Sequence, residues 1–114
     1  MDRFVERLLA VIDVEKVILC GDYASGTPSW YSDIRLLVIS PSFDSLDWIN
    51  RGDLLARYGG LEEPLIVAWG FTPGKIAAHL AGDRYELFLA HALSESREVY
   101  HQGPAALASR GNKR

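Results

Sequence analysis

The sequence predicts an α/β (α+β) fold with a mixed four-stranded sheet and helices mainly on one face. Two patterns in its 114 residues support this prediction. Short runs rich in Val, Ile and Leu, each bounded by Gly, Ser, Asp or Pro, are typical of buried strands. Between these runs, apolar residues recur at the spacing of amphipathic helices. Hydrophobic residues make up 48% of the chain, which is usual for one globular domain with a substantial core.

The first 40 residues predict a helix, a strand, a loop and a second strand. Residues 2–12 should form a helix, because one stripe of that segment holds Phe4, Val5, Leu8, Leu9 and Ile12. A strand is expected over 14–20 and a loop over 21–31, with room for one helical turn after Gly21. The next strand, 34–40, is apolar on both faces after Arg35, which predicts a place in the middle of the sheet.

A helix capped by Asp44 or Ser45 should follow and run to about Arg57, although Gly52 weakens it. Gly59 and Gly60 are expected to end this helix.

The remaining elements are a strand over 64–69, a helix over 73–81, a last helix and a short edge strand over 98–101. Thr72 is expected to cap the helix that Pro73 begins. The last helix has an apolar stripe of Tyr85, Phe88, Leu89, Ala92 and Leu93. We therefore predict one domain over residues 1–103 and a flexible tail over 104–114.

Composition excludes several classes of partner. The net charge is −3 and no basic cluster precedes the last five residues, so a nucleic-acid footprint is not expected. No apolar run is long enough to span a membrane and the first residues do not resemble a signal peptide, which predicts a cytoplasmic protein. The single cysteine, Cys20, is expected to be a small buried hydrophobe.

The stretch from Gly21 to Ser40 contains the candidate functional residues of the sequence. Its small-residue segment, Gly21 to Gly26, allows backbone N–H groups to approach a ligand closely. Ser32 and Asp33 then stand at the mouth of the second predicted strand.

This arrangement resembles the nucleotidyltransferase superfamily, in particular its minimal, single-domain members. Their motif reads Gly-Ser, three residues, Gly, five residues, Ser-Asp-x-Asp-Leu. The matching positions here are Gly21, Gly26, Ser32, Asp33 and Leu36. The family's Ser after the first Gly is replaced by Asp22, and its second metal-binding Asp by Arg35.

The third acidic residue of the family lies on the third strand, five places before a Thr-Pro pair that begins a helix. Thr72 and Pro73 match that pair, and Val67 stands five places earlier. Of three family carboxylates, only Asp33 remains.

The resemblance implies a Mg²⁺ site, because nucleotidyl transfer needs Mg²⁺ to neutralise the triphosphate and activate the attacking hydroxyl. Asp33 is the candidate catalytic residue and metal ligand, and Asp22 is a speculative second catalytic group. The candidate nucleotide-binding residues are Gly21, Asp22, Gly26, Ser32 and Arg35. Because two of three acidic positions are replaced, we expect no catalysis by the family mechanism and no cofactor; Mg²⁺ is expected only if the site is active.

Alternatives remain open at this cleft. Arg35 either pairs with Asp33 and neutralises a relic site, or holds an anionic group directly in place of the metal. A rewired metal site would draw on Asp22 and Asp33, with Glu62 or Glu63.

The aromatic and histidine residues give further hypotheses. Trp30 and Tyr31 can stack on a base, contact a partner or cover the open end of the sheet. The spacing of His79, His91 and His101 is not that of metal ligands, and each is expected to be a surface or boundary residue.

Three functions follow from these residues and the resemblance. The first is a catalytically degenerate nucleotidyltransferase-like protein that acts by binding, either as a homodimer or with a helical partner of the HEPN type. The resemblance implies such a partner, because small family members act as antitoxins to HEPN-type proteins. The second is an active nucleotidyltransferase that transfers a nucleotide from ATP at a rewired site. The third is a nucleotide sensor that binds without reacting.

Overall fold

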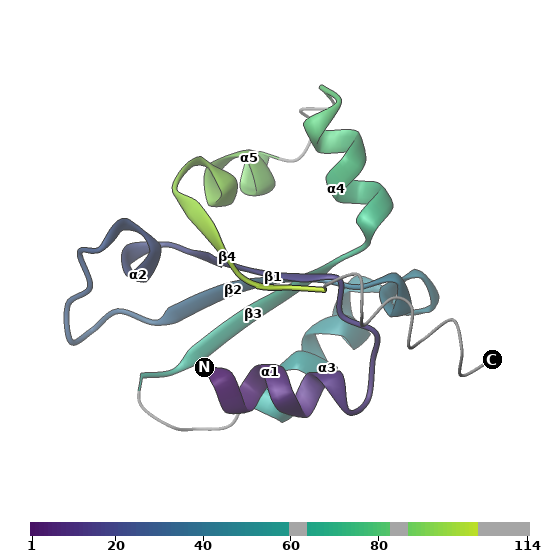
Figure 1. Cartoon of the computed structure of the whole chain (residues 1–114), viewed down its shortest axis with the longest axis horizontal. Helices are drawn as coiled ribbons and strands as arrows, with labels where there is room; N and C mark the ends of the chain where they lie inside the picture. The colour runs from purple at the N-terminus through teal and green to yellow at the C-terminus, as the bar shows by residue number, and fades with distance from the viewer. Residues whose placement is uncertain (60–63, 83–86, 103–114) are drawn as a thin grey trace.

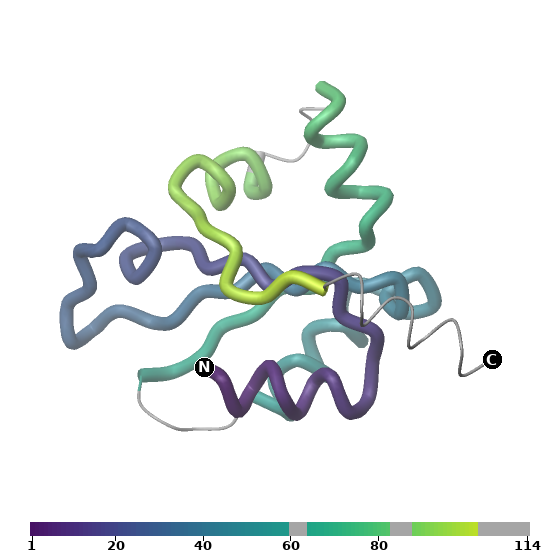
Figure 2. Tube along the Cα trace, in the orientation of Figure 1, coloured from purple at the N-terminus to yellow at the C-terminus, as the bar shows by residue number. Residues whose placement is uncertain are grey.

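A computed structural model of the chain describes residues 1–59, 64–82 and 87–102 (Figures 1 and 2). The elements are, in order, α1 (Asp2–Leu9), β1 (Lys16–Cys20), α2 (Asp22–Ser25), β2 (Ile34–Ile39), the 3-10 helix η1 (Pro41–Ser45), α3 (Trp48–Gly59), β3 (Ile66–Phe71), α4 (Pro73–Leu80), α5 (Leu87–Ser94) and β4 (Ser96–His101). The helical turn expected after Gly21 is present as α2. The proposed tail, 104–114, lies outside the described residues.

Within the described residues, four strands form one mixed sheet, as the sequence predicts, and their order is β3-β2-β1-β4. β1 pairs antiparallel with both β2 and β4, whereas β2 and β3 are parallel. The expected central position of β2 and edge position of β4 are confirmed. β3 forms the other edge of the sheet.

The helices lie on both faces of this sheet, which corrects the expectation that they lie mainly on one. Figure 1 shows α1 and α3 below the sheet and α4 and α5 above it. Successive side chains of a strand point to opposite faces. In β1, Val17 and Leu19 belong to the core cluster with α1, while Ile18 and Cys20 belong to the cluster with α4 and α5. Because both faces of β1 and β2 are apolar, each face needs a helical cover.

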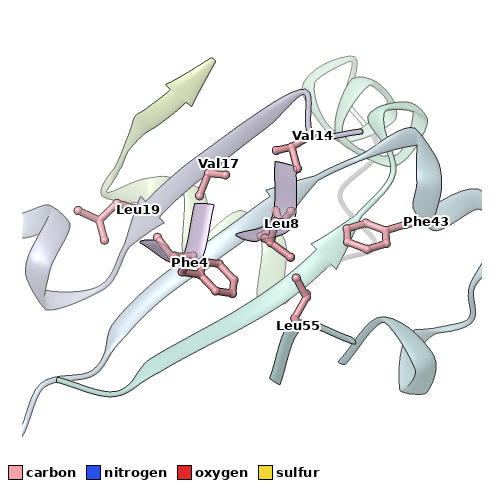
Figure 3. Packing of buried hydrophobic residues seen from close by; sticks show 9 residues of the cluster. Phe4, Leu8, Val14, Val17, Leu19, Phe43 and Leu55 are labelled. Carbon is pink, nitrogen blue, oxygen red and sulfur yellow. The ribbon is translucent and has the colours of Figure 1, made fainter. Parts of the chain in front are cut away.

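The lower core is the larger of the two that the described residues form. In Figure 3, Phe4 and Leu8 of α1 and Leu55 of α3 meet the apolar side chains of the sheet and of Phe43. The upper core contains Ile18, Cys20, Leu37, Ile39, Phe71, Ile76 and Leu89. Together the two layers cover both faces of the sheet with helices.

The segment between β2 and α3 differs from its prediction. Residues 41–45 form a 3-10 helix because Ser40 accepts a hydrogen bond from the amide of Ser42 and Pro41 stands at its first position. The cap of α3 is Asp47, whose Oδ1 accepts from the amide of Asn50 at 2.8 Å, and not Asp44 or Ser45. α3 runs through Gly52 without a break.

Three further elements begin or end at residues that differ from the prediction. α1 ends at Leu9, and the amide of Ile12 still bonds to the carbonyl of Leu8. β3 extends to Phe71 because its last residues pair with the end of β2. β4 begins at Ser96, two residues earlier than expected, because Ser96 pairs with Cys20.

The helix that follows β3 begins as predicted, with Thr72 as its cap: Thr72 Oγ1 accepts from the amide of Lys75 at 3.2 Å. In the part of the chain that the structure describes, no helix has the length and apolar character needed to cross a membrane.

Candidate functional site

The candidate site lies where β1 ends and β2 begins, around the turn that Gly21 opens. Gly21 has φ +73°, a left-handed conformation that glycine adopts without strain. A Cβ at this position would also stand 3.1 Å from Cδ of Arg35. The backbone at Gly21 therefore packs directly against the Arg35 side chain. At the other end of α2, Gly26 caps the helix in the left-handed region at φ +76°.

A polar network fixes the loop that follows α2. The hydroxyl of Ser32 donates to Asp22 Oδ2 at 2.8 Å. The amide of Ser29 donates to Ser32 Oγ at 3.0 Å. These bonds hold the Asp22 carboxylate beside the start of β2.

Four of the predicted site residues line one cavity of about 120 Å³: Asp22, Ser32, Asp33 and Arg35. Ser29 and Tyr31 complete its lining. Of the remaining predicted residues, Gly21 lines a neighbouring cavity and Gly26 lies on the exposed turn. The motif therefore does bring its polar residues together.

Arg35 and Val67 are neighbours across the sheet. They are Cα partners in the parallel pair β2–β3, and Arg35 is also the partner of Cys20 in β1. The two positions that the resemblance matches to metal-binding carboxylates thus lie side by side, as the matched strands require.

These residues do not fit a Mg²⁺ site. Mg²⁺ takes oxygen ligands, and neither a guanidinium nor an isopropyl group supplies one. A guanidinium also repels a divalent cation. Across residues 1–59, 64–82 and 87–102, no group of three or more His, Cys, Asp or Glu side chains is placed to hold a metal ion. Glu62 and Glu63, considered for a rewired site, lie outside the described residues.

The ion pair between Asp33 and Arg35, one of the two alternatives left open for Arg35, does not form among the described residues. Both side chains line the same cavity, but no hydrogen bond or ion pair joins them there. Arg35 instead lies between this cavity and a second one, because it lines both.

The second cavity, of about 330 Å³, lies under α5 on the upper face of the sheet. Its aromatic side consists of Trp69 and Phe88, whose ring centroids are 5.0 Å apart. Its polar side includes Asp22, Arg35, His91 and Glu95. The hydroxyl of Ser25 bonds to the carboxylate of Glu95 and so links α2 to the end of α5.

The sequence analysis did not identify Glu95 as a site residue, because residues 94–97 form a polar run without a recognisable motif. Glu95 reaches the cleft only because β4 pairs with β1, and 70 positions separate it from Ser25. The register of that strand pair is the signal that would have located it. His91 is exposed, as expected, but it also lines the second cavity. His79 is buried, at 6% exposure, which corrects the expectation that it is a surface or boundary residue.

Cys20 is buried, as predicted, at the inner edge of the cleft. Its thiol donates to the carbonyl of Arg35 at 3.5 Å. Burial raises the pKa of the Cys20 thiol, and the nearby Arg35 charge offsets part of that rise. The thiol is therefore protonated at neutral pH and is a poor nucleophile.

Trp30 and Tyr31 project from the loop between α2 and β2. Their exposed fractions are 85% and 76%, and their ring centroids are 4.1 Å apart. Side chains this exposed do not cover the end of the sheet, which excludes the interpretation that Trp30 and Tyr31 are a cover. The other two interpretations, a stacking platform and a partner contact, remain.

The fold matches solved structures, whereas the sequence does not match known families. No protein-family profile and no curated protein sequence is similar enough to this chain to match it. A crystal structure of a candidate nucleotidyltransferase from Sulfolobus solfataricus is 14% identical, with a TM-score of 0.62, and the match covers 87% of this chain and 75% of that one. A toxin-antitoxin structure with AMP-PNP is 17% identical, with a TM-score of 0.61, and the match covers 98% and 85%.

The protein therefore has a nucleotidyltransferase-type fold. At these identities the likeness establishes the arrangement of the chain and not its activity. The ability of the cleft to bind a metal ion or catalyse a reaction depends on the residues that line it.

Proposed function

We propose that this protein is a catalytically degenerate nucleotidyltransferase-like protein that acts by binding another protein chain. The observation that carries this proposal is the pairing of Arg35 with Val67, where the family resemblance implies metal-binding carboxylates. With Asp33 the only family carboxylate left, the cleft lacks the ligands for the metal-assisted reaction.

The proposed binding partner is a helical protein of the HEPN type, with a second copy of this chain as the alternative. Two observations support a protein partner. One similar structure is a toxin-antitoxin structure, and its match covers 98% of this chain. Trp30 and Tyr31 form an exposed aromatic pair beside the cleft, and aromatic residues are enriched at protein interfaces. We also propose a cytoplasmic location.

A pyrophosphate-release assay with ATP and Mg²⁺ tests the loss of catalysis. Asp33→Asn is the matched control, because it removes the last family carboxylate while keeping the shape of the side chain. We expect the wild-type protein to release pyrophosphate no faster than Asp33→Asn. Release by the wild type that Asp33→Asn abolishes would overturn the proposal and favour an active site built on Asp22 and Asp33.

Light scattering tests the binding role. The protein is measured alone over a range of concentrations and then mixed with a HEPN-type protein from the same organism. We expect either a homodimer or a defined complex. A chain that stays monomeric at every concentration and forms no complex would contradict a role in protein binding.

A second candidate function is nucleotide binding without turnover. The Arg35 guanidinium lines both cavities of the cleft and can contact an anionic group directly. Asp22 and Glu95 oppose this role, because carboxylates repel phosphate oxygens. Saturable ATP binding in the presence of EDTA, lost in Arg35→Gln, would establish this function.

A further inference from the structure

A cavity of about 500 Å³ lies at the end of the sheet opposite the candidate site. The candidate site is at the start of β2, whereas this cavity is at the end of the parallel strand β3, where the chain turns into α4 (Figure 1). Its lining residues are Trp48, Arg51, Phe71, Thr72 and Lys75. Ligands of open α/β sheets commonly bind at the carboxyl ends of strands, and the volume is within the range of about 300–1,000 Å³ typical of small-molecule sites.

Arg51 gives this cavity a fixed positive charge. Its Nε donates to the carbonyl of Leu46 at 2.8 Å, and its Nη2 to the carbonyl of Phe43 at 2.9 Å. Its Nη1 donates to the carbonyl of Gly70 at 3.4 Å. A guanidinium carries five N–H groups, so two remain beyond these three bonds. The side chain is therefore held in place before any ligand arrives and keeps donors to offer it.

The other polar residues of the cavity strengthen its preference for anions. Lys75 contributes a second positive charge from the first turn of α4. Thr72 caps that helix, whose N-terminal end carries a partial positive charge. No carboxylate is among the described residues that line the cavity.

Aromatic rings form the remaining wall. The ring centroids of Trp48 and Phe71 are 5.4 Å apart in an edge-to-face arrangement. Trp48 is 51% exposed, so its indole has an uncovered surface. An indole face can stack on a planar ring of a ligand.

We propose that this cavity binds a small organic anion in which a planar ring carries one phosphate or carboxylate group. Arg51 and Lys75 bind the anionic group, and the ring lies against Trp48. This site does not depend on the proposed function, because it shares no residue with the cleft around Arg35 and needs no metal.

Titration of the ¹⁵N-labelled full chain by NMR tests the proposal at residue level. The probes are phenyl phosphate and benzoate, with inorganic phosphate as a ring-free anion and phenol as an uncharged ring. We expect saturable shifts of the Trp48 indole N–H and of the Gly70 and Thr72 amides with both ring-bearing anions. Phosphate and phenol should bind at least about tenfold more weakly, because each lacks one of the two contacts.

Lys75→Met and Trp48→Ala should each weaken phenyl phosphate binding by about tenfold while leaving the fold intact. Arg57→Met is the matched control, because Arg57 is exposed at the end of α3 and outside the cavity. Its affinity should equal that of the wild type. Absence of saturable shifts at Trp48, equal binding of inorganic phosphate, or equal losses in Arg57→Met and Lys75→Met would each overturn the proposal.

Discussion

Arg35 and Val67 face each other across the parallel strands β2 and β3, at the two positions that the family resemblance matches to metal-binding carboxylates. The chain has the nucleotidyltransferase-type fold, and a guanidinium and an isopropyl group stand at the positions where the family resemblance implies oxygen ligands. Gly21 packs against the Arg35 side chain, so the turn before the site and the substituted residue are fitted to each other.

The first prediction concerns this contact. Gly21→Ala should lower the free energy of unfolding by about 1–2 kcal/mol, because φ +73° disfavours a Cβ and that Cβ would stand 3.1 Å from Arg35 Cδ. The measurement is urea unfolding. Gly52→Ala is the matched control: Gly52 lies inside α3 with open space around it, so the same substitution should raise stability by up to about 1 kcal/mol. Equal effects at both positions would contradict the packing described at Gly21.

The second prediction concerns pH. Because burial raises the pKa of the Cys20 thiol above its usual value of 9.0, the unfolded chain loses this proton at a lower pH than the folded chain does. Ionisation therefore favours unfolding: the stabilising contribution is complete below pH 9.0 and is lost as the pH rises toward the folded pKa. Between pH 9.0 and the folded pKa, the wild type should lose up to about 1.4 kcal/mol per pH unit more than Cys20→Ala does. Parallel stability curves for the two proteins in urea unfolding at alkaline pH would contradict the assignment.

The third prediction concerns the exposed aromatic pair. If Trp30 and Tyr31 contact the protein partner, replacing both by Ala should weaken the homodimer or the HEPN-type complex by more than about thirtyfold, as expected for an aromatic hot spot. The melting temperature of the isolated chain should not change, because both side chains project into solvent. Sedimentation measures the first quantity and calorimetry the second. Undiminished association with the double variant would place the interface elsewhere.

Local sequence patterns predicted most of the fold and also the grouping of the polar residues that line the first cavity. The apolar runs gave the strands, and the motif spacing placed Asp22, Ser32, Asp33 and Arg35 together, because they lie within one loop and the strand that follows it. The distribution of helices over two faces was not predicted correctly. That information was present in the unbroken apolar pattern of β1 and β2, which requires a cover on each side.

The site residues that could not be predicted depend on contacts between parts of the chain that are far apart in the sequence. Glu95 joins the cleft through the register of β4 on β1. Arg51 bonds to the carbonyls of Phe43 and Leu46, just before its own helix, and also to that of Gly70 on β3. Neither position lies in a recognisable motif. Their roles become visible only when the strands and helices are placed in space.

The most direct test of the central claim, that this nucleotidyltransferase-type fold has lost its metal site, is a calorimetric titration of ATP with and without Mg²⁺. The wild type is compared with the Arg35→Asp, Val67→Asp double variant, which places carboxylates at the two facing positions, where the family resemblance implies them. We expect no Mg²⁺-dependent ATP binding by the wild type and a gain of such binding in the double variant. Tight binding of Mg²⁺-ATP by the wild-type protein would contradict the loss of the metal site and would make Asp22 and Asp33 the residues to replace next.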